Sequence, residues 1–216
     1  MTDKAATDIL RLRTFGMRDY GATWQAMREF TDARDADTPD ELWLLEHSPV
    51  YTLGLNGDPR HLLKTTDAPV LKTDRGGQIT WHGPGQLIAY TLVDLRRKQL
   101  GIRALVGGLE QAVIDLLRQY GIAARARPEA PGVYVEGRKI AALGLRVRRG
   151  CSYHGLSLNV NPDLAGFAAI NPCGQAGLEV TSLARLGIAA EVHDLMAPLA
   201  VEIMEKLNFR GLTPGP

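Results

Sequence analysis

The apolar positions of this chain follow two different periods. In the first, short apolar runs or apolar–polar alternations are bounded by turn-forming residues, which is typical of β-strands. This pattern occupies residues 9–14, 41–46, 50–54, 87–93, 132–135, 138–147 and 151–160. The stretch over 87–93 is almost wholly apolar, so it predicts a strand buried in the core.

In the second period, apolar residues recur every three or four positions, as on one face of a helix. Asp19 is placed to cap the first such helix, and residues 105–120 carry the longest helical pattern. Gly121 suits the left-handed position just beyond a helix end. We expect a short helix to start at residues 181–182 and a last helix to start with Asp194 as its cap.

Strands and helices are interleaved, with no internal repeat or linker between them. The chain has 216 residues, which suffices for one domain with a substantial core and without disulfides or metal. We therefore predict a single domain over residues 1–216, of the α/β (α+β) class, with a mixed, largely antiparallel sheet and flanking helices. Residues 213–216 are expected to form a frayed end.

Composition and charge exclude several classes of protein. Apolar residues make up 45% and charged residues 23%, as in ordinary soluble globular proteins. The net charge of +1 gives no overall attraction to nucleic acid or to a membrane. No apolar run approaches the ~20 residues of a membrane span, and the polar residues 1–8 do not resemble a secretory signal. We expect a cytoplasmic monomer with reduced thiols and with neither a nucleic-acid nor a membrane partner.

Residues 74–86 concentrate chemical groups in a way that a simple turn does not need. They hold four glycines together with Arg75, Trp81 and His82, and the predicted buried strand follows directly. Glycine lets bare backbone approach a ligand closely, whereas flexible linkers lack such large side chains. We interpret the segment as a glycine-rich polar loop at a binding site. It is not a phosphate-binding P-loop, which requires GxxxxGK[ST].

The two cysteines differ in their surroundings. Cys173 lies between Pro172 and Gly174, where a thiol can be reached, whereas Cys151 lies in a strand pattern. A nucleophilic thiol needs access and a nearby positive charge, while a structural cysteine usually lies in an apolar run. Cys151 is therefore interpreted as structural. For Cys173 the sequence context alone leaves both a structural and a nucleophilic role open.

Lys139 is a candidate for the required positive charge. Strand alternation places it on the same face as Ala141, Leu143 and Leu145. A lysine there either extends to solvent past the strand end or is held near a buried site. Small residues nearby leave room for a substrate groove, and a lysine beside a thiol can stabilise the thiolate and transfer protons.

Three histidines and the two cysteines raise the question of a zinc site. The spacings of His47, His82 and His154 match no helical or zinc-knuckle pattern, so no metal is expected. His154 fits either a core histidine with satisfied hydrogen bonds or a residue that lines a site, and both interpretations stay open.

Six segments together resemble the lipoyl(octanoyl) transferases of lipoate biosynthesis. In the order of that family they are residues 46–49, 51–54, 75–86, 137–146, 154–160 and 171–174. The longest reads RGGQITWHGPGQ, and its Trp81 departs from the family, where another aromatic residue such as Tyr is commoner. No segment is specific alone, whereas the combination, which spans about residues 40–185, is highly specific.

The resemblance implies a fold shared with the catalytic domains of lipoate and biotin protein ligases. It implies transfer of an octanoyl group from the phosphopantetheine of acyl carrier protein to a lysine of lipoyl domains, in 2-oxoacid dehydrogenase complexes and in glycine cleavage H protein. Cys173 falls on the acyl-thioester nucleophile of the family and Lys139 on the lysine that tunes it, and no cofactor or metal is implied. The residues that fall on substrate-lining segments are Arg75, Gly76, Gly77, Gln78, Ile79, Thr80, Trp81, His82, Ala142, Leu143, Gly144, Gly155, Leu156 and Ser157.

Two other functions would fit parts of the same pattern. An ATP-dependent lipoate or biotin protein ligase shares the fold, but it activates its acid as an adenylate and needs no nucleophilic cysteine. A catalytically silent carrier-binding protein would tolerate the loss of Lys139 or Cys173, and both are present. Exchange of one thioester for another costs little free energy, so a transferase of this kind needs no ATP.

Overall fold

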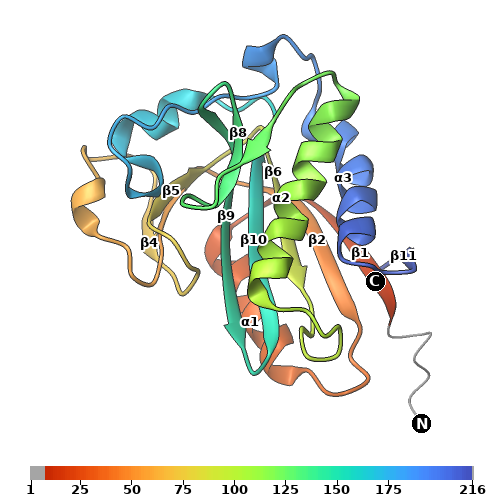
Figure 1. The fold of residues 1–216 in the computed structure, drawn as a ribbon. Helices are drawn as coiled ribbons and strands as arrows, with labels where there is room; N and C mark the ends of the chain where they lie inside the picture. The colour runs from red at the N-terminus through yellow and green to blue at the C-terminus, as the bar shows by residue number, and fades with distance from the viewer. Residues whose placement is uncertain (1–7, 216) are drawn as a thin grey trace.

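A computed structural model describes residues 8–215 of the chain (Figure 1). Its elements are β1 (Ile9–Arg18), α1 (Tyr20–Ala33), β2 (Asp40–His47), β3 (Val50–Leu53), η2 (Pro59–His61), β4 (Val70–Lys72), β5 (Ile79–His82), β6 (Gln86–Leu92), α2 (Ile102–Gln119), β7 (Arg125–Ala126), β8 (Gly132–Val135), β9 (Arg138–Arg148), β10 (Cys151–Asn159), η3 (Leu164–Ala169), η4 (Pro172–Gly174), η5 (Ala184–Leu186), α3 (Val192–Lys206) and β11 (Gly211–Pro214), where η marks a short 3₁₀ turn. The polar N-terminal segment considered above lies outside the described residues, apart from its last position.

Two sheets form the framework of the fold. The large sheet has the order β11-β1-β2-β6-β10-β9-β8-β7, and the small one has the order β4-β3-β5. In the large sheet β1 runs parallel to β2 and β11, and the other neighbours are antiparallel. The predicted class, a mixed and largely antiparallel sheet with flanking helices, is confirmed.

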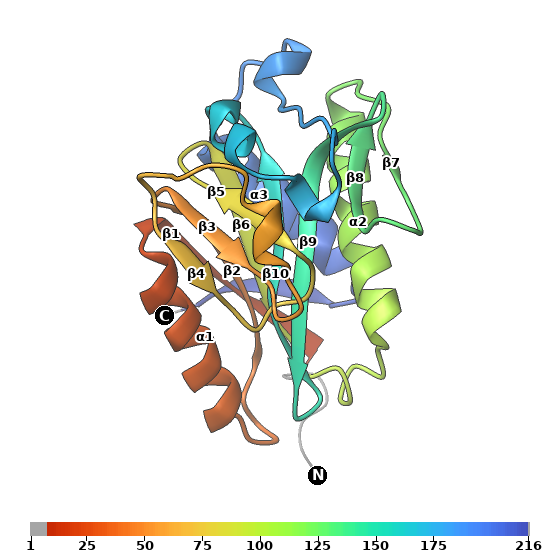
Figure 2. The ribbon, with the colours of Figure 1, turned by 90° about the vertical axis from the view of Figure 1, so that its left-hand side faces the viewer.

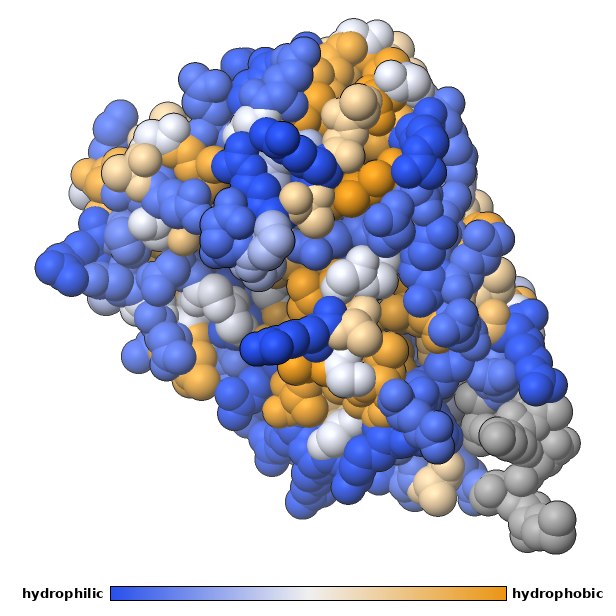
Figure 3. Space-filling view, in the orientation of Figure 1, coloured by the Kyte–Doolittle hydropathy of each residue, from blue (hydrophilic) through white to orange (hydrophobic). Residues whose placement is uncertain are grey.

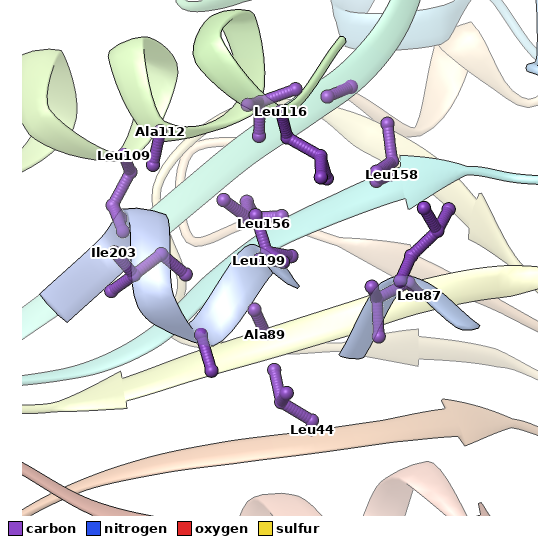
Figure 4. Packing of buried hydrophobic residues seen from close by; sticks show 14 of the residues in the cluster. Leu44, Leu87, Ala89, Leu109, Ala112, Leu116, Leu156, Leu158, Leu199 and Ile203 are labelled. Atoms are coloured by element: carbon purple, nitrogen blue, oxygen red, sulfur yellow. The ribbon is translucent and has the colours of Figure 1, made fainter. Parts of the chain in front are cut away.

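Helices cover the two faces of the large sheet. In Figure 2, α1 and α2 lie on opposite sides of it, and the small sheet lies on the same side as α1. The main core fills the space between the sheet and the helix pair α2 and α3. Figure 4 shows its packing: the labelled members are Leu44, Leu87, Ala89, Leu156 and Leu158 from strands and Leu109, Ala112, Leu116, Leu199 and Ile203 from helices.

Strand β6 lies at the centre of this arrangement, and all its residues are buried. Leu87 and Ala89 belong to the core under α2 and α3, whereas Ile88 and Tyr90 belong to the second core under α1. Successive side chains of a strand point to opposite faces, so β6 must be apolar on both. The predicted buried strand is confirmed. Within residues 8–215, no helix combines the length and apolarity that crossing a membrane demands.

Several predicted helix ends are confirmed and one is wrong. The Asp19 carboxylate accepts a hydrogen bond of 2.8 Å from the backbone N–H of Ala22, and Gly121 has a φ of 72° just beyond α2. The cap of α3 is Glu191 instead of Asp194. Asp194 occupies the third helical position and accepts a 2.9 Å hydrogen bond from the Glu191 backbone N–H, which completes a capping box. The sequence contains two acidic residues, Glu191 and Asp194, that can cap this helix, and the apolar pattern does not show which of them precedes the first turn.

Other local expectations need correction as well. Residues 211–214 are not frayed, because they pair with the exposed edge of β1 as the parallel strand β11. Residues 79–82 form strand β5 within the segment interpreted as a loop, and they pair with β3. Both segments gain their backbone hydrogen bonds from strands distant in sequence. Short-range periodicity does not contain that information.

The buried face of α3 gives a first test of this core. Leu199 is fully buried, whereas Val201, two residues further along the same helix, is 43% exposed. Leu199→Ala is expected to lower the free energy of unfolding by about 2–5 kcal/mol, because it removes packed methyl groups and leaves a cavity. Val201→Ala should change it by at most about 0.5 kcal/mol. Urea unfolding at constant m-value measures both, and equal losses would contradict the assigned packing.

Candidate active site

A cavity of about 890 Å³ lies where the two sheets meet, with walls from β5 of the small sheet and from β6, β9 and β10 of the large one. Figure 3 shows apolar side chains gathered between polar borders on the face that carries α2 and β9. The exposed side chains of Ile102 and Val147 form part of the cavity wall on this face. Of the residues predicted from the sequence, the cavity brings together Lys139, Cys173, Arg75, Gly76, Gly77, Gln78, Ile79, Thr80, His82, Ala142, Leu143, Gly144, Gly155, Leu156 and Ser157.

The floor of the cavity is a trough of small residues on two paired strands. Ala142 of β9 lies opposite Ser157 of β10, and Gly144 lies opposite Gly155. A side chain at Gly144 would come within 3.0 Å of the Gly76 carbonyl oxygen. Glycine at that position therefore lets the polar loop lie directly over the strand.

Arg75 holds this loop in place. Its guanidinium donates to the Thr52 hydroxyl at 3.0 Å and to the carbonyl oxygens of Gly76 and Gln78, each at 2.8 Å. Arg75 is buried, with 7% of its surface exposed. Among residues 8–215, no carboxylate forms an ion pair with its guanidinium. Burial lowers the pKa of Arg75, but a guanidinium still keeps its charge at neutral pH. It therefore places a positive charge beside the cavity, which favours an anion there.

Trp81 is the one predicted substrate-lining residue that the cavity does not include. It packs edge-on against Phe167, with ring centroids 5.4 Å apart, in a separate core under the small sheet. Its neighbours Thr80 and His82 do line the cavity. Adjacent residues of a strand point to opposite faces, so β5 directs Trp81 away from the site. The structure therefore does not bring Trp81 to the cavity with the other predicted residues.

A β-bulge determines where the Lys139 side chain lies. The register of β8 and β9 shifts between Val133 and Tyr134, so that β9 contains one extra residue. Ile140 and Ala141, although adjacent, both lie in the main core. Lys139 therefore lies on the cavity side instead of sharing a face with Ala141, and the expected simple alternation is wrong here.

Lys139 and Cys173 form the closest chemical contact of the cavity. The Lys139 ammonium lies 3.0 Å from the Cys173 sulfur, and it also donates to the Pro131 carbonyl oxygen at 3.1 Å. It sits 5.1 Å from the centroid of the Tyr134 ring, where the π-face attracts a cation. Burial works against its charge, yet the Cys173 sulfur and the Tyr134 hydroxyl raise the pKa of Lys139. Lys139 is thus an ammonium at neutral pH, and its positive charge lies against the Cys173 sulfur.

The backbone presents Cys173 in an unusual way. Its φ of 56° lies in the left-handed region, which costs a residue with a side chain about 1–3 kcal/mol. The short turn η4 that contains it starts with Pro172, and its half-exposed thiol lies at the cavity. Cys151, in contrast, is buried in β10, and burial raises the pKa of its thiol. Of the two cysteines, Cys173 combines access from the cavity with a cation in contact with its sulfur.

The inner part of the cavity contains polar residues that the sequence pattern did not single out. Tyr20, Asp74 and Tyr90 line it, together with His154, for which two roles remained open. His154 is both buried and site-lining, since it is 1% exposed and its Nε2 lies 3.0 Å from the Asp74 carboxylate. Asp74 directly precedes the Arg75 motif, which was the only sequence signal for it. Across residues 8–215 there is no group of three or more potential metal ligands.

Comparisons with known proteins identify the family of the chain. The model of the lipoyl protein ligase A/B catalytic domain matches residues 19–203. An octanoyltransferase of Methylococcus capsulatus is 62% identical over 197 residues, covering 91% of this chain and 95% of the relative. An octanoyltransferase of Alkalilimnicola ehrlichii is 56% identical and covers 96% of each chain.

Solved structures share the fold at much lower identity. A bi-partite lipoate protein ligase of Thermoplasma acidophilum superposes with a TM-score of 0.73 at 15% identity, over 96% of this chain and 85% of that one. A biotin protein ligase of Aquifex aeolicus in complex with biotin and ATP gives 0.58 at 12% identity, over 91% and 70%. Because the family model spans most of the chain and close relatives match nearly all of it, the chain belongs to the family of lipoyl protein ligase A/B catalytic domains.

Proposed function

We propose that this acyltransferase moves an octanoyl group from acyl carrier protein to a lysine of a lipoyl domain, through a thioester on Cys173. Octanoyl transfer in lipoate biosynthesis follows from its octanoyltransferase relatives. The observation that carries the finer mechanism is the 3.0 Å contact between the Lys139 ammonium and the Cys173 sulfur at the cavity. A ligase that activates its acid with ATP has no use for this pair.

In the first step the Cys173 thiolate attacks the carbonyl carbon of the octanoyl thioester. The new bond to sulfur forms, the bond to the phosphopantetheine sulfur breaks, and the leaving thiolate takes a proton from the Lys139 ammonium. The acyl group is then held on Cys173, and Lys139 is left neutral. The buried positive charge of Arg75 favours the anionic tetrahedral species on the way.

Acylation also changes the acidity of Lys139. Burial alone lowers the pKa of a lysine, and the neighbouring sulfur is the main group that opposes it here. Once the sulfur is acylated it has no negative charge, so the largest contribution that raises the pKa of Lys139 is lost and the pKa falls. Lys139 is thereby prepared to act as a base in the second step.

In the second step the amine of the acceptor lysine attacks the acyl carbon on Cys173. An amide bond forms, the bond to Cys173 breaks, and neutral Lys139 takes the proton that the amine loses. The thiolate and the ammonium are restored together. Amide formation from a thioester is downhill, so the cycle requires neither ATP nor a bound cofactor.

The requirement for nucleotide gives the direct test of the proposed function. The protein is mixed with octanoyl-carrier and a lipoyl domain, with no nucleotide present, and the lipoyl domain is weighed by mass spectrometry. We expect one octanoyl group per lipoyl domain, with Cys173→Ala as the inactive control. Transfer that appears only after ATP and free octanoate are added would instead support a ligase.

The role of Lys139 is tested by the pH dependence of thiol alkylation. Removal of a neighbouring cation disfavours a thiolate, so Lys139→Ala should shift the alkylation of Cys173 by iodoacetamide to higher pH. The activity profile should shift in the same direction. Lys139→Arg keeps a charge but cannot act as a base, so it should retain much of the thiolate and lose transfer to the acceptor amine. An alkylation profile that does not change in Lys139→Ala would contradict this role.

A further inference from the structure

The trough in the cavity floor leads from the Lys139–Cys173 pair to a buried polar end. Along the paired strands β9 and β10, the Ala142–Ser157 pair is followed by Gly144–Gly155 and then by His154 opposite Leu145. From the Ala142 position to that of Leu145 is three residues, roughly 10 Å along a strand. The trough therefore offers the length of a medium acyl chain before it reaches His154.

Burial identifies His154 and its surroundings as the inner end of the cavity. The cavity residues Tyr20 and Tyr90 are 2% and 4% exposed, whereas Leu55 at the outer part is 44% exposed. Their aromatic rings form one cluster: the ring centroids of Tyr90 and His154 are 6.1 Å apart, and those of Tyr20 and His82 are 5.8 Å apart. The trough thus runs along small residues to a buried wall of polar aromatic residues.

Hydrogen bonds fix the orientation and the tautomer of His154. The Asp74 carboxylate accepts from Trp24 at 2.8 Å, from the Tyr153 hydroxyl, and from His154 Nε2. Although burial opposes it, these donors hold the pKa of Asp74 well below its usual range. An ionised carboxylate only accepts hydrogen bonds, so His154 Nε2 carries the proton and Nδ1 carries a lone pair.

Two polar atoms of this wall lack a partner among residues 8–215. His154 Nδ1 is buried and accepts no hydrogen bond, and burial lowers the pKa of this histidine, which keeps it neutral. The Tyr20 hydroxyl is also buried without a hydrogen bond of normal geometry, although Thr73 and Arg75 lie near it. The Tyr90 hydroxyl differs, because it lies 2.7 Å from His47 Nε2 and is satisfied.

The backbone at His154 has a strained, left-handed conformation that the surrounding structure must hold in place. Its φ is 60°, in the region that residues with side chains avoid. Tyr153 and His154 are adjacent in β10, yet their side chains contact the same carboxylate of Asp74. The left-handed backbone breaks the strand alternation and places the imidazole at the end of the trough.

We propose that this polar end, with water bound to His154 Nδ1 and the Tyr20 hydroxyl, sets the upper limit of the acyl chain length. The inference rests on the proposed function, in which the acyl group extends from Cys173 along the trough. A chain that reaches the wall must displace this water and leave the two atoms unpaired. One more buried methylene gains less than an unpaired buried polar atom costs, so longer chains are rejected.

The test is a competition between two chain lengths. Equal amounts of octanoyl-carrier and decanoyl-carrier are given to the protein with a limiting lipoyl domain, and mass spectrometry gives the ratio of the two products. The wild-type chain should favour octanoyl. Tyr20→Phe removes only the hydroxyl, whereas His154→Phe removes Nδ1 together with the Nε2–H that donates to Asp74, and each should raise the decanoyl to octanoyl ratio by about tenfold.

Matched variants separate this effect from general damage. His154→Asn keeps a polar side chain that tolerates the left-handed backbone, so it should keep the preference for octanoyl. Tyr51→Phe removes a hydroxyl outside the cavity, which donates to the Gly166 carbonyl oxygen at 2.8 Å, and should leave the ratio unchanged. Tyr20→Phe tests the proposal even if the histidine variant fails to fold.

Three results are distinguishable. A raised ratio in Tyr20→Phe or His154→Phe, with both control variants unchanged, supports the polar end as the length limit. A ratio unchanged in Tyr20→Phe and in folded His154→Phe overturns it, because the wall then has only a structural role. A wild-type chain that transfers neither acyl group overturns the proposed function itself, and the length limit with it.

Discussion

A lysine ammonium held against a thiol inside the protein is the interaction on which this site depends. Burying a charge is costly unless hydrogen bonds and an opposite charge compensate for it. At Lys139 the Pro131 carbonyl oxygen, the Tyr134 ring and the Cys173 sulfur together provide that compensation. The contact therefore requires that the β8–β9 hairpin, which carries Lys139, and the η4 turn, which carries Cys173, lie side by side.

Two left-handed residues mark the two ends of the same trough. Cys173 has a φ of 56° at the reactive end, and His154 has a φ of 60° at the buried end. Such conformations persist only where the surrounding structure enforces them. Between them, Gly144 and Gly155 let neighbouring backbone pack closely, and Arg75 holds the polar loop over β9. The large sheet carries Lys139 on β9 and His154 on β10, and it thereby fixes how far apart these two residues lie.

Much of this site was predictable from residue types in the sequence. Residue types mark Cys173 in its Pro-Cys-Gly turn and Lys139 in its strand as candidates and leave the role of Cys173 open, whereas the family resemblance assigns the roles and the structure places the two side chains in contact. The alternation of apolar residues also indicated the mixed sheet and the buried strand β6. The strands are visible in local patterns, and a reactive residue type in an unusual local context is a signal of function.

The remaining features depend on contacts that the sequence pattern does not contain. The extra residue that redirects Lys139 exists only because β8 pairs with β9 in a shifted register. Trp81 turns away from the site because β5 pairs with β3, which the loop interpretation excluded. Asp74 and Tyr20 line the cavity beside β10, although both are distant from β10 in the sequence. Tertiary pairing decided each of these positions.

The central claim is that Cys173 alone carries the acyl group, and the chain has an internal control for it in Cys151. The protein is incubated with octanoyl-carrier and no acceptor, and the modified peptide is identified by mass spectrometry after hydroxylamine treatment of a parallel sample. We expect one hydroxylamine-labile octanoyl group on Cys173, formed equally in Cys151→Ser and absent in Cys173→Ala. An octanoyl group on Cys151, or transfer to a lipoyl domain by Cys173→Ala at the wild-type rate, would contradict it.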